Sequence, residues 1–263
     1  MTHDTATLTA TDASADRVAD AVAAFRRDGV VVIDNVVDPA LLAQCWQQIE
    51  HDYSADRLSG KSGFALDHDA RRFSMALTVE GALAESDVLL NPLIVAFAQQ
   101  VLGGDHVMDS FGLLLSLPGA PDQKLHYDAL LFPDTALDRV LPTSTIAVAM
   151  PLVTMDEMSG STAFWRGSHR NPAISGDPDF APRVPVGSVL LWDYRIMHKG
   201  LANRSEHLRP VLFSALCRPW WYEHRAAETD QYEKLVLTRP AWDTYRGKAR
   251  RFLRRAKIVE TAE

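Results

Sequence analysis

Between residues 107 and 218 the chain consists of short apolar runs separated by turn residues, and no helical pattern long enough for a strand–helix–strand crossover intervenes. Strands this short pair with antiparallel neighbours, because a parallel neighbour needs a crossover of roughly a dozen residues or more. A mainly β protein with an antiparallel barrel or sandwich as its core is therefore predicted. The runs expected to form strands cover residues 111–117, 145–153, 162–165, 188–192 and 210–217.

Helices are expected before this core. Asp12 and Ser14 can cap a first helix, and Gly29 ends it because glycine readily adopts the left-handed conformation that terminates helices. The stretch 53–72 loses periodicity and is interpreted as a long surface loop, which is either a lid or binding segment or merely mobile chain. The other N-terminal predictions are a buried strand at 30–33 and helices at 39–49 and 89–102.

A single domain over residues 1–263 is expected, since β-rich barrels often reach this length as one domain. Residues 1–15 are polar and are expected to be flexible, and residues 225–263 are expected to form a helical C-terminal segment. Within that segment a helix over 241–258 is rich in lysine and arginine. A solvated helix face explains this pattern, and a site for an anionic partner is the alternative.

The formal charge of −7 gives the chain no general attraction for nucleic acid or for anionic lipid, so neither is expected as a partner. No apolar run reaches the roughly 20 residues that cross a bilayer, and the N-terminus lacks the apolar stretch of a signal peptide. A cytoplasmic protein is therefore predicted. Cys45 and Cys217 are interpreted as reduced, buried thiols.

The segment Lys124-Leu125-His126-Tyr127-Asp128 contains the first candidate metal ligands. Residues two apart on a strand point to the same side, so His126 and Asp128 can present an imidazole nitrogen and a carboxylate oxygen to one point. A His-x-Asp motif is weak by itself, and a mere hydrogen-bonded pair is the alternative interpretation. Tyr127 points to the opposite side and is interpreted as a packing residue.

A metal held by two histidines and one carboxylate needs a second histidine from a distant strand, and it keeps adjacent positions open for other ligands. His198 can supply that histidine, since it follows the predicted strand at 188–192; an ordinary core histidine is the alternative. Arg209 begins a later strand that contains no acidic residue. Its guanidinium could grip a carboxylate through two parallel hydrogen bonds.

Four stretches of the sequence, taken together, are typical of one known family. They are His126-x-Asp128; Asp156-Glu157-Met158-Ser159-Gly160-Ser161 running into Phe164-Trp165-Arg166-Gly167-Ser168-His169; Gly187-Ser188-Val189-Leu190-Leu191-Trp192 with His198, Asn203, Ser205 and Arg209; and Phe25-Arg26-Arg27-Asp28-Gly29-Val30-Val31-Val32. With this combination the chain, from about Val18 to Pro219, resembles the phytanoyl-CoA dioxygenase family of iron(II) and 2-oxoglutarate oxygenases.

The resemblance implies a double-stranded β-helix, a jelly-roll or cupin-like core, with flanking helices. It implies that His126, Asp128 and His198 hold Fe(II) and serve catalysis, and that Arg209 binds the distal carboxylate of 2-oxoglutarate. Such an enzyme consumes O2 and releases succinate and CO2. Because halogenating relatives lack the carboxylate that Asp128 provides here, hydroxylation is expected, with desaturation or ring formation as other outcomes.

The sequence departs from the family pattern two residues after the second histidine, where relatives often carry serine and this chain has Gly200. Thr145 or Thr143 is therefore predicted to assist Arg209 in binding the carboxylate. The turn Ser159-Gly160-Ser161 replaces a familiar Asn-Gly-Pro and is expected to keep its shape through the glycine. His169 is interpreted as a structural residue of its turn.

A small, apolar molecule of secondary metabolism is the predicted substrate, and the basic C-terminal segment leaves an anionic one open. The alternative function is a cupin-like metal-binding protein that is non-catalytic or independent of 2-oxoglutarate, against which Arg209 argues. A homodimer is left open. Apolar residues that could line the substrate site are Leu130, Leu131, Phe132 and Leu137, whereas Trp192, Trp220 and Trp221 are interpreted as core.

Overall fold

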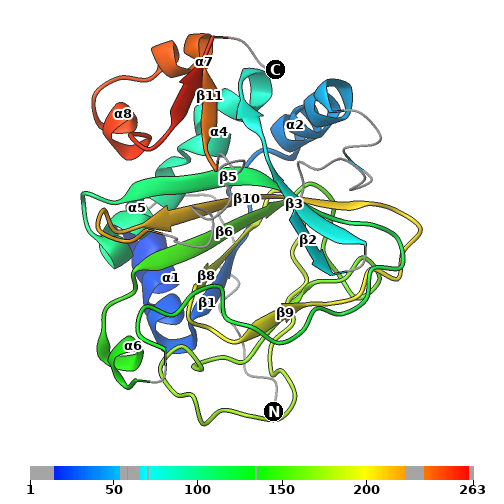
Figure 1. Cartoon of the computed structure of the whole chain (residues 1–263), viewed down its shortest axis with the longest axis vertical. Coiled ribbons are helices and arrows are strands. Elements are labelled where there is room, and N and C mark those ends of the chain that lie inside the picture. Colours follow the sequence, from blue (N-terminus) through cyan, green and yellow to red (C-terminus); the bar gives the residue numbers. More distant parts are fainter. Residues whose placement is uncertain are drawn as a thin grey trace.

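Seven strands form the main sheet of the protein, in the order β1-β8-β6-β10-β5-β3-β2, and every neighbouring pair is antiparallel (Figure 1). The computed structural model describes residues 15–53, 58, 66–69, 71–133, 135–222 and 234–260. The antiparallel, mainly β prediction is confirmed. The strands are β1 (Val30–Ile33), β2 (Leu66–Asp69), β3 (Arg72–Ala76), β5 (Val107–Ser116), β6 (Thr145–Pro151), β8 (Val189–Asp193) and β10 (Arg209–Cys217).

A second, shorter layer lies below the main sheet in Figure 1. In it β7 (Thr162–Phe164) pairs with β9 (His198–Gly200), and single bridges extend the layer to His126 and to Phe180. Two antiparallel layers that face each other form the predicted double-stranded β-helix, or jelly roll. Each layer contributes residues to the candidate site.

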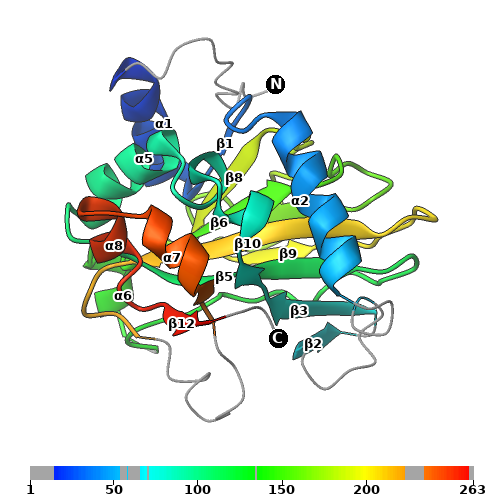
Figure 2. The same ribbon diagram turned by 90° about the horizontal axis from the view of Figure 1, so that it is seen from above.

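Three helices cover the other face of the main sheet (Figure 2). Asp38 and Asn91 cap two of them, each accepting a hydrogen bond from the backbone N–H two residues on, and a proline follows each cap. Phe25 and Phe97 join two helices edge to face, with 5.2 Å between their ring centroids. The helices are α1 (Ala15–Asp28), α2 (Pro39–Asp52) and α5 (Pro92–Leu102).

Side chains of the central strands alternate between these two faces of the main sheet. On β6, Ile146 and Val148 pack in the large core that includes the helices, whereas Ala149 packs with Val211 of β10 in a separate, smaller cluster. That smaller cluster also contains Phe164 of the second layer, so it marks the inner side of the jelly roll. The candidate site lies on this inner side.

The C-terminal segment contains strands as well as helices. The prediction of one helix over 241–258 is wrong, because Gly247, with a φ of 52°, separates α7 (Arg239–Thr244) from α8 (Lys248–Phe252) and the chain then extends as β12 (Lys257–Val259). β12, β11 (Val236–Thr238) and β4 (Thr78–Val79) form a small parallel sheet.

The interpretation of 53–72 as a surface loop is wrong at its C-terminal end, where β2 and the start of β3 extend the main sheet. Arg72, counted there as one charge of a surface loop, is 0% exposed. Most of the stretch lies outside the described residues, as do residues 1–14. The remaining short elements are a 3-10 helix, η1 (Gly81–Ala84), and the one-turn helices α4 (Ser86–Leu89) and α6 (Leu137–Val140).

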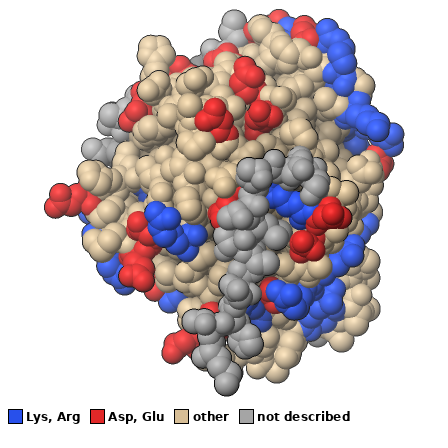
Figure 3. Space-filling model, turned by 180° about the vertical axis from the view of Figure 1, so that it is seen from behind, with Lys and Arg blue, Asp and Glu red and all other residues tan. Residues whose placement is uncertain are grey.

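Several arginines of the C-terminal segment form ion pairs. Arg250 lies 3.1 Å from Asp243, and Arg251 lies 2.7 Å from Asp105. On the face drawn in Figure 3, Lys and Arg side chains stand in small groups, several of them beside Asp or Glu. These pairs favour the solvated-face interpretation of the segment. Across the described ranges, the model contains no helix of the length and apolarity that a membrane span requires.

Candidate metal and co-substrate site

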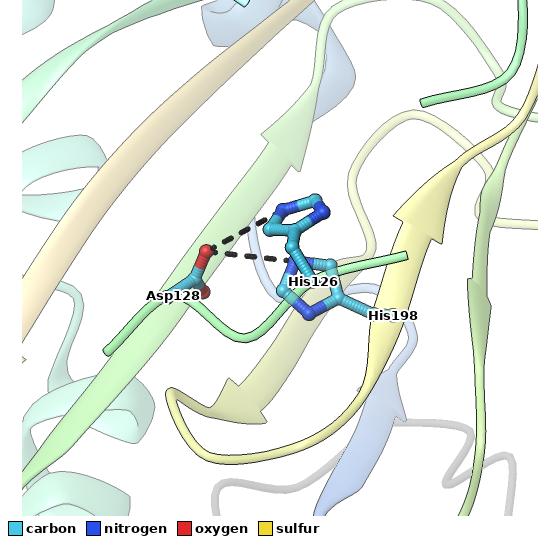
Figure 4. Close-up of side chains that lie close together, drawn as sticks. All are labelled: His126, Asp128 and His198. Atoms are coloured by element: carbon cyan, nitrogen blue, oxygen red, sulfur yellow. Dashed lines mark ion pairs between the residues drawn. The ribbon is translucent and has the colours of Figure 1, made fainter. Parts of the chain in front are cut away.

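Three candidate ligands converge between the two layers (Figure 4). His126 and His198 are bridge partners, and each backbone N–H donates to the other's carbonyl oxygen, at 3.1 and 3.0 Å. Asp128 Oδ1 lies 3.5 Å from His198 Nε2 and 3.9 Å from His126 Nε2. The ligand atoms of all three residues lie within 4.8 Å of one another. His198, which lies 70 positions after Asp128 in the sequence, thus joins His126 and Asp128 in a group of the size that one metal ion requires.

Both imidazole rings are fixed by their backbone. Nδ1 of His126 lies 2.8 Å from the carbonyl oxygen of Lys124, and Nδ1 of His198 lies 3.1 Å from that of Ile196. A carbonyl oxygen only accepts, so each ring carries its proton on Nδ1 and turns the lone pair of Nε2 toward Asp128. Burial lowers the pKa of His198, which favours the neutral imidazole that a metal needs.

Solvent reaches this group from one side. The side chain of His126 is 36% exposed, whereas that of His198 is 5% exposed. The open side therefore lies at His126 and at the loop after it, and the closed side lies against β9.

Asp128 is held by two neighbours. Its backbone N–H donates to the carbonyl oxygen of Tyr194 at 3.0 Å, and the indole N–H of Trp192 donates to its Oδ2 at 2.8 Å. Trp192 was expected to be an ordinary core residue, but it is half-buried and contacts a candidate ligand. Of the other two predicted core tryptophans, Trp221 is buried and Trp220 is 62% exposed.

Arg209, the first residue of β10, is 2% exposed. Its guanidinium donates to the carbonyl oxygen of Gly160 at 2.7 Å and to Ser116 Oγ at 2.5 Å, while its Nε is buried without a hydrogen-bond partner. Burial and the nearby charge of Arg72 lower the pKa of Arg209 to about 9. Within the described part of the chain no carboxylate pairs with Arg209, so its cation lacks the anionic partner that a buried charge requires.

Arg72 is a second buried arginine at the same place, and sequence reasoning missed it. Its Nε donates to Ser116 Oγ at 2.9 Å, so one hydroxyl accepts hydrogen bonds from both guanidinium groups. A Cβ at Gly200 would lie 3.4 Å from Arg72 Cζ and 2.6 Å from Gln123 Oε1. The glycine that departs from the family pattern therefore leaves space for the two side chains that surround it.

The turn before β7 supplies one of the Arg209 contacts. Gly160 has a φ of 82°, and a Cβ there would lie 2.5 Å from the carbonyl oxygen of Leu201. The turn is tightened by Asp156, whose Oδ1 accepts hydrogen bonds from the backbone N–H groups of Met158 and Ser159 at 2.9 Å. The expectation that the turn keeps its shape through Gly160 is confirmed. It directs the Gly160 carbonyl toward Arg209.

Thr145 lies far from Arg209, and the prediction that it assists the same carboxylate is wrong. Thr145 pairs with Cys217 at the last residue of β10, whereas Arg209 is the first. Eight residues of strand separate the two positions by about 26 Å. Thr143, the other candidate, donates to Asp193 Oδ2 at 2.7 Å. The residues that do lie beside Arg209 are Arg72 and Ser116.

The fold and the site define a class of protein, and comparison with known proteins identifies its family. The jelly-roll fold and the pair of histidines with one carboxylate define the class of non-haem iron oxygenases. A family model described as phytanoyl-CoA dioxygenase (PhyH) matches residues 25–211, and the chain belongs to that family. The predicted reaction class, a dioxygenase that depends on Fe(II) and 2-oxoglutarate, is confirmed at the level of the family.

Individual relatives are more distant. "Dioxygenase trt7" of Aspergillus terreus is 25% identical over 201 residues, which cover 73% of this chain and 70% of the relative. The solved structure of HygX from Streptomyces hygroscopicus, with nickel and 2-oxoglutarate bound, has a TM-score of 0.61 at 17% identity and covers 82% of this chain and 95% of that one. The non-heme alpha ketoglutarate dependent epimerase SnoN from nogalamycin biosynthesis also has a TM-score of 0.61, at 18% identity, with 78% and 84% covered. The two structures support the fold.

Proposed function

We propose that His126, Asp128 and His198 hold an Fe(II) ion and that the protein hydroxylates a small, apolar metabolite with 2-oxoglutarate as co-substrate. The observation that carries this proposal is the convergence of three ligand atoms with both imidazole protons fixed on Nδ1. Two imidazole nitrogens and one carboxylate oxygen are the donor set of non-haem iron(II) oxygenases. The residues present therefore fit the metal.

Bound iron supplies the activation of O2 and the oxidation of 2-oxoglutarate to succinate and CO2. The protein itself fixes the three ligands and leaves the site open to solvent on one side. His198 is held from the buried side, and the half-exposed His126 borders the side from which co-substrate and substrate enter. Three protein ligands leave adjacent coordination positions for those molecules.

Arg209 and Arg72 are proposed to bind the distal carboxylate of 2-oxoglutarate, with Ser116 as the hydroxyl between them. A planar guanidinium suits a carboxylate because two parallel N–H groups can donate to its two oxygens. A bound anion would also offset the burial and the repulsion from Arg72 that together lower the pKa of Arg209. Both arginines lie on strands of the main sheet whose inner side faces the metal ligands.

An apolar substrate is supported by the side chains that solvent reaches on this inner side. Leu114, Phe213 and Trp192 are half-buried although they lie in the middle of otherwise buried strands. Their neighbours are small, since Phe213 pairs with Gly112 on one side and with Ala149 on the other. A surface of aromatic and aliphatic groups next to small residues takes up apolar molecules.

The loop that follows Asp128 adds apolar groups near the open side. Phe132 is 46% exposed and Leu137 is 48% exposed. The loop is held in place by the buried carboxylate of Asp138, which accepts hydrogen bonds from the backbone N–H groups of Leu131 and Phe132 at 3.0 and 2.9 Å. An ordered apolar loop beside the ligands is typical of a binding wall for a small metabolite.

Anaerobic titration with Fe(II) and then 2-oxoglutarate tests the proposal. The wild-type protein should develop the visible metal-to-ligand charge-transfer band of an iron–2-oxoglutarate chelate, and His198→Ala should lose it. His207→Ala, which changes an exposed histidine outside the site, is the matched control and should keep the band. Bound iron without the band in the wild type would instead favour the cupin-like alternative.

The cytoplasmic location and a homodimer stay predictions, which fractionation and gel filtration test.

A further inference from the structure

We propose that Trp192 is a positioning residue for the metal centre: its indole N–H holds one oxygen of the Asp128 carboxylate and thereby presents only the other oxygen to the metal. This inference rests on the proposed metal site and adds to it a residue outside the three ligands. It does not depend on which substrate the enzyme oxidises.

The contact is specific to one oxygen atom. Trp192 Nε1 donates to Asp128 Oδ2 at 2.8 Å, whereas Oδ1 is the oxygen that faces His198 Nε2 at 3.5 Å and His126 Nε2 at 3.9 Å. An indole N–H is a donor without acceptor capacity and does not titrate in water. It can therefore hold a carboxylate oxygen without competing for the metal.

The indole is itself held by its surroundings. Trp192 lies on β8, where its cross-strand partners are Ala147 of β6 and Val30 of β1. The small Ala147 leaves space on the inner side for a large ring. Ring centroids of Phe164 and His198 lie 5.8 and 5.6 Å from the centroid of Trp192. The same side chain thus contacts one candidate ligand through its N–H and a second through its ring.

The hydrogen bond has a consequence for coordination. A free carboxylate can turn about its Cβ–Cγ bond and bind a metal through one oxygen or both, and the second mode occupies a position that a co-substrate needs. With Oδ2 engaged by Trp192, Asp128 is restricted to one metal bond through Oδ1. Partners of this kind around a metal site typically change metal affinity about 10- to 100-fold when they are removed.

Trp192→Phe tests the proposal, because it removes the N–H and keeps an aromatic ring. The matched control is Trp165→Phe: the indole of Trp165 donates to the carbonyl oxygen of Gly176 at 2.9 Å, away from the three ligands. Titrated with Co(II), Trp192→Phe should bind about tenfold more weakly than the wild type, with a changed visible spectrum. Trp165→Phe should match the wild type. Equal affinity and an equal spectrum in Trp192→Phe would overturn the proposal.

A double-mutant cycle separates positioning from general packing. In an Asp128→Ala background the acceptor is missing, so adding Trp192→Phe should change the weakened Co(II) affinity no further. A tenfold loss that persists in that background would mean that Trp192 acts independently of Asp128 and would contradict the proposal. If the wild type bound no Co(II) at all, the metal site itself would be refuted rather than the role of Trp192.

A measurement on the indole itself applies even where Trp192→Phe does not fold. The chain contains six tryptophans, so its 15N-labelled indole groups give six N–H signals. In the Zn(II)-loaded protein, the indole N–H groups of Trp192 and Trp165 should both exchange slowly because both are hydrogen-bonded, and one signal should lose this protection in Asp128→Ala. Unchanged exchange of all six signals in that variant would contradict the hydrogen bond.

Discussion

Two arginines lie at opposite ends of β10, and the protein holds them in opposite ways. At the end where β10 begins, Arg209 contacts a hydroxyl and a carbonyl oxygen and lies beside a second cation. At the end where β10 stops, Arg255 lies 2.5 Å from Asp109 Oδ1 and 3.3 Å from Cys217 Sγ. It also donates to the carbonyl oxygen of Trp221 at 2.7 Å. Arg255 has an anionic partner within the chain, whereas among the described residues Arg209 has none.

The difference distinguishes a structural arginine from the arginine that we propose binds 2-oxoglutarate. A paired arginine such as Arg255 neutralises a carboxylate that burial would otherwise destabilise, and it joins the C-terminal segment to the core. The charged form of Arg209 is unfavourable in the protein without a bound carboxylate, because burial and the charge of Arg72 both disfavour it. It becomes favourable only when a carboxylate from outside the chain binds. One end of β10 thus contributes to stability, and the other end is the one proposed to bind the co-substrate.

Arg209→Met tests the binding end and should have the largest effect. Removing a buried cation that lacks an acidic partner should leave the melting temperature of the metal-loaded protein unchanged or raise it, since apolar replacements of buried charges are often neutral or stabilising. The affinity for 2-oxoglutarate should fall roughly 100-fold, about 3 kcal/mol, the cost of losing one partner of a buried charge pair. Thermal shift measured against 2-oxoglutarate concentration reports both quantities.

Arg204→Met, at an exposed arginine of the same region, is the control for that measurement and should retain the stabilisation by 2-oxoglutarate. A variant at Arg209 that melts several degrees lower but binds 2-oxoglutarate as the wild type does would reverse the assignment. Arg209 would then be the structural arginine, and the carboxylate would bind elsewhere.

Arg255→Met tests the structural end. It leaves Asp109, which is 6% exposed, with Lys234 at 3.5 Å as its remaining cation. A buried carboxylate that loses its nearest partner should lower the free energy of unfolding by about 2 kcal/mol, or the melting temperature by about 4–8 °C. Urea denaturation measures the first quantity directly. Affinity for 2-oxoglutarate in the folded variant should equal that of the wild type, and a large loss of that affinity would show that the two ends are not independent.

The sequence predicts the part of this contrast that depends on local features, and it does not predict the part that depends on contacts between distant strands. Arg209 could be singled out because its own strand contains no acidic residue, which a reader of the sequence can see. Arg72 and Ser116 could not, because they meet Arg209 only through the strand order β10-β5-β3, in which Ser116 pairs with both arginines although these lie 137 positions apart in the sequence. The run Arg72-Phe73-Ser74-Met75-Ala76 alternates polar and apolar residues and was the one available signal of that strand.

Two of the wrong predictions have a common physical cause. Thr145 is predicted as a substitute for the serine that relatives often carry at the position of Gly200, but antiparallel pairing places it at the far end of β10. The helix over 241–258 was selected on helical spacing, but Gly247 and the pairing of β12 with β11 decide that region. Local spacing gives the type of many elements, whereas the strand order and register decide which residues meet.

His106 offers the smallest test, at the structural end. Its ring packs edge to face on Phe252 of α8 with centroids 5.1 Å apart, its Nδ1 donates to the carbonyl oxygen of Gly103 at 2.7 Å, and its Nε2 is buried without a hydrogen-bond partner. Burial lowers the pKa of His106, and the nearby Asp105 and Arg254 act in opposite directions on it. The neutral ring is therefore the form that the fold accepts.

An unfolded histidine takes up its proton near pH 6.5, whereas His106 in the folded protein stays neutral to a lower pH. Between those two values the unfolded state binds more protons, so stability should fall as the pH falls below about 6.5 and should be fully present above it. His106→Phe removes this contribution, and its stability should decline less than that of the wild type between pH 7 and pH 5 in urea denaturation. Part of the decline should remain, because burial lowers the pKa of His169 as well. An equal decline in both proteins would mean that His106 is protonated in the folded protein. The structural end of β10 would then hold a buried charge of the same kind as Arg209 at the other end.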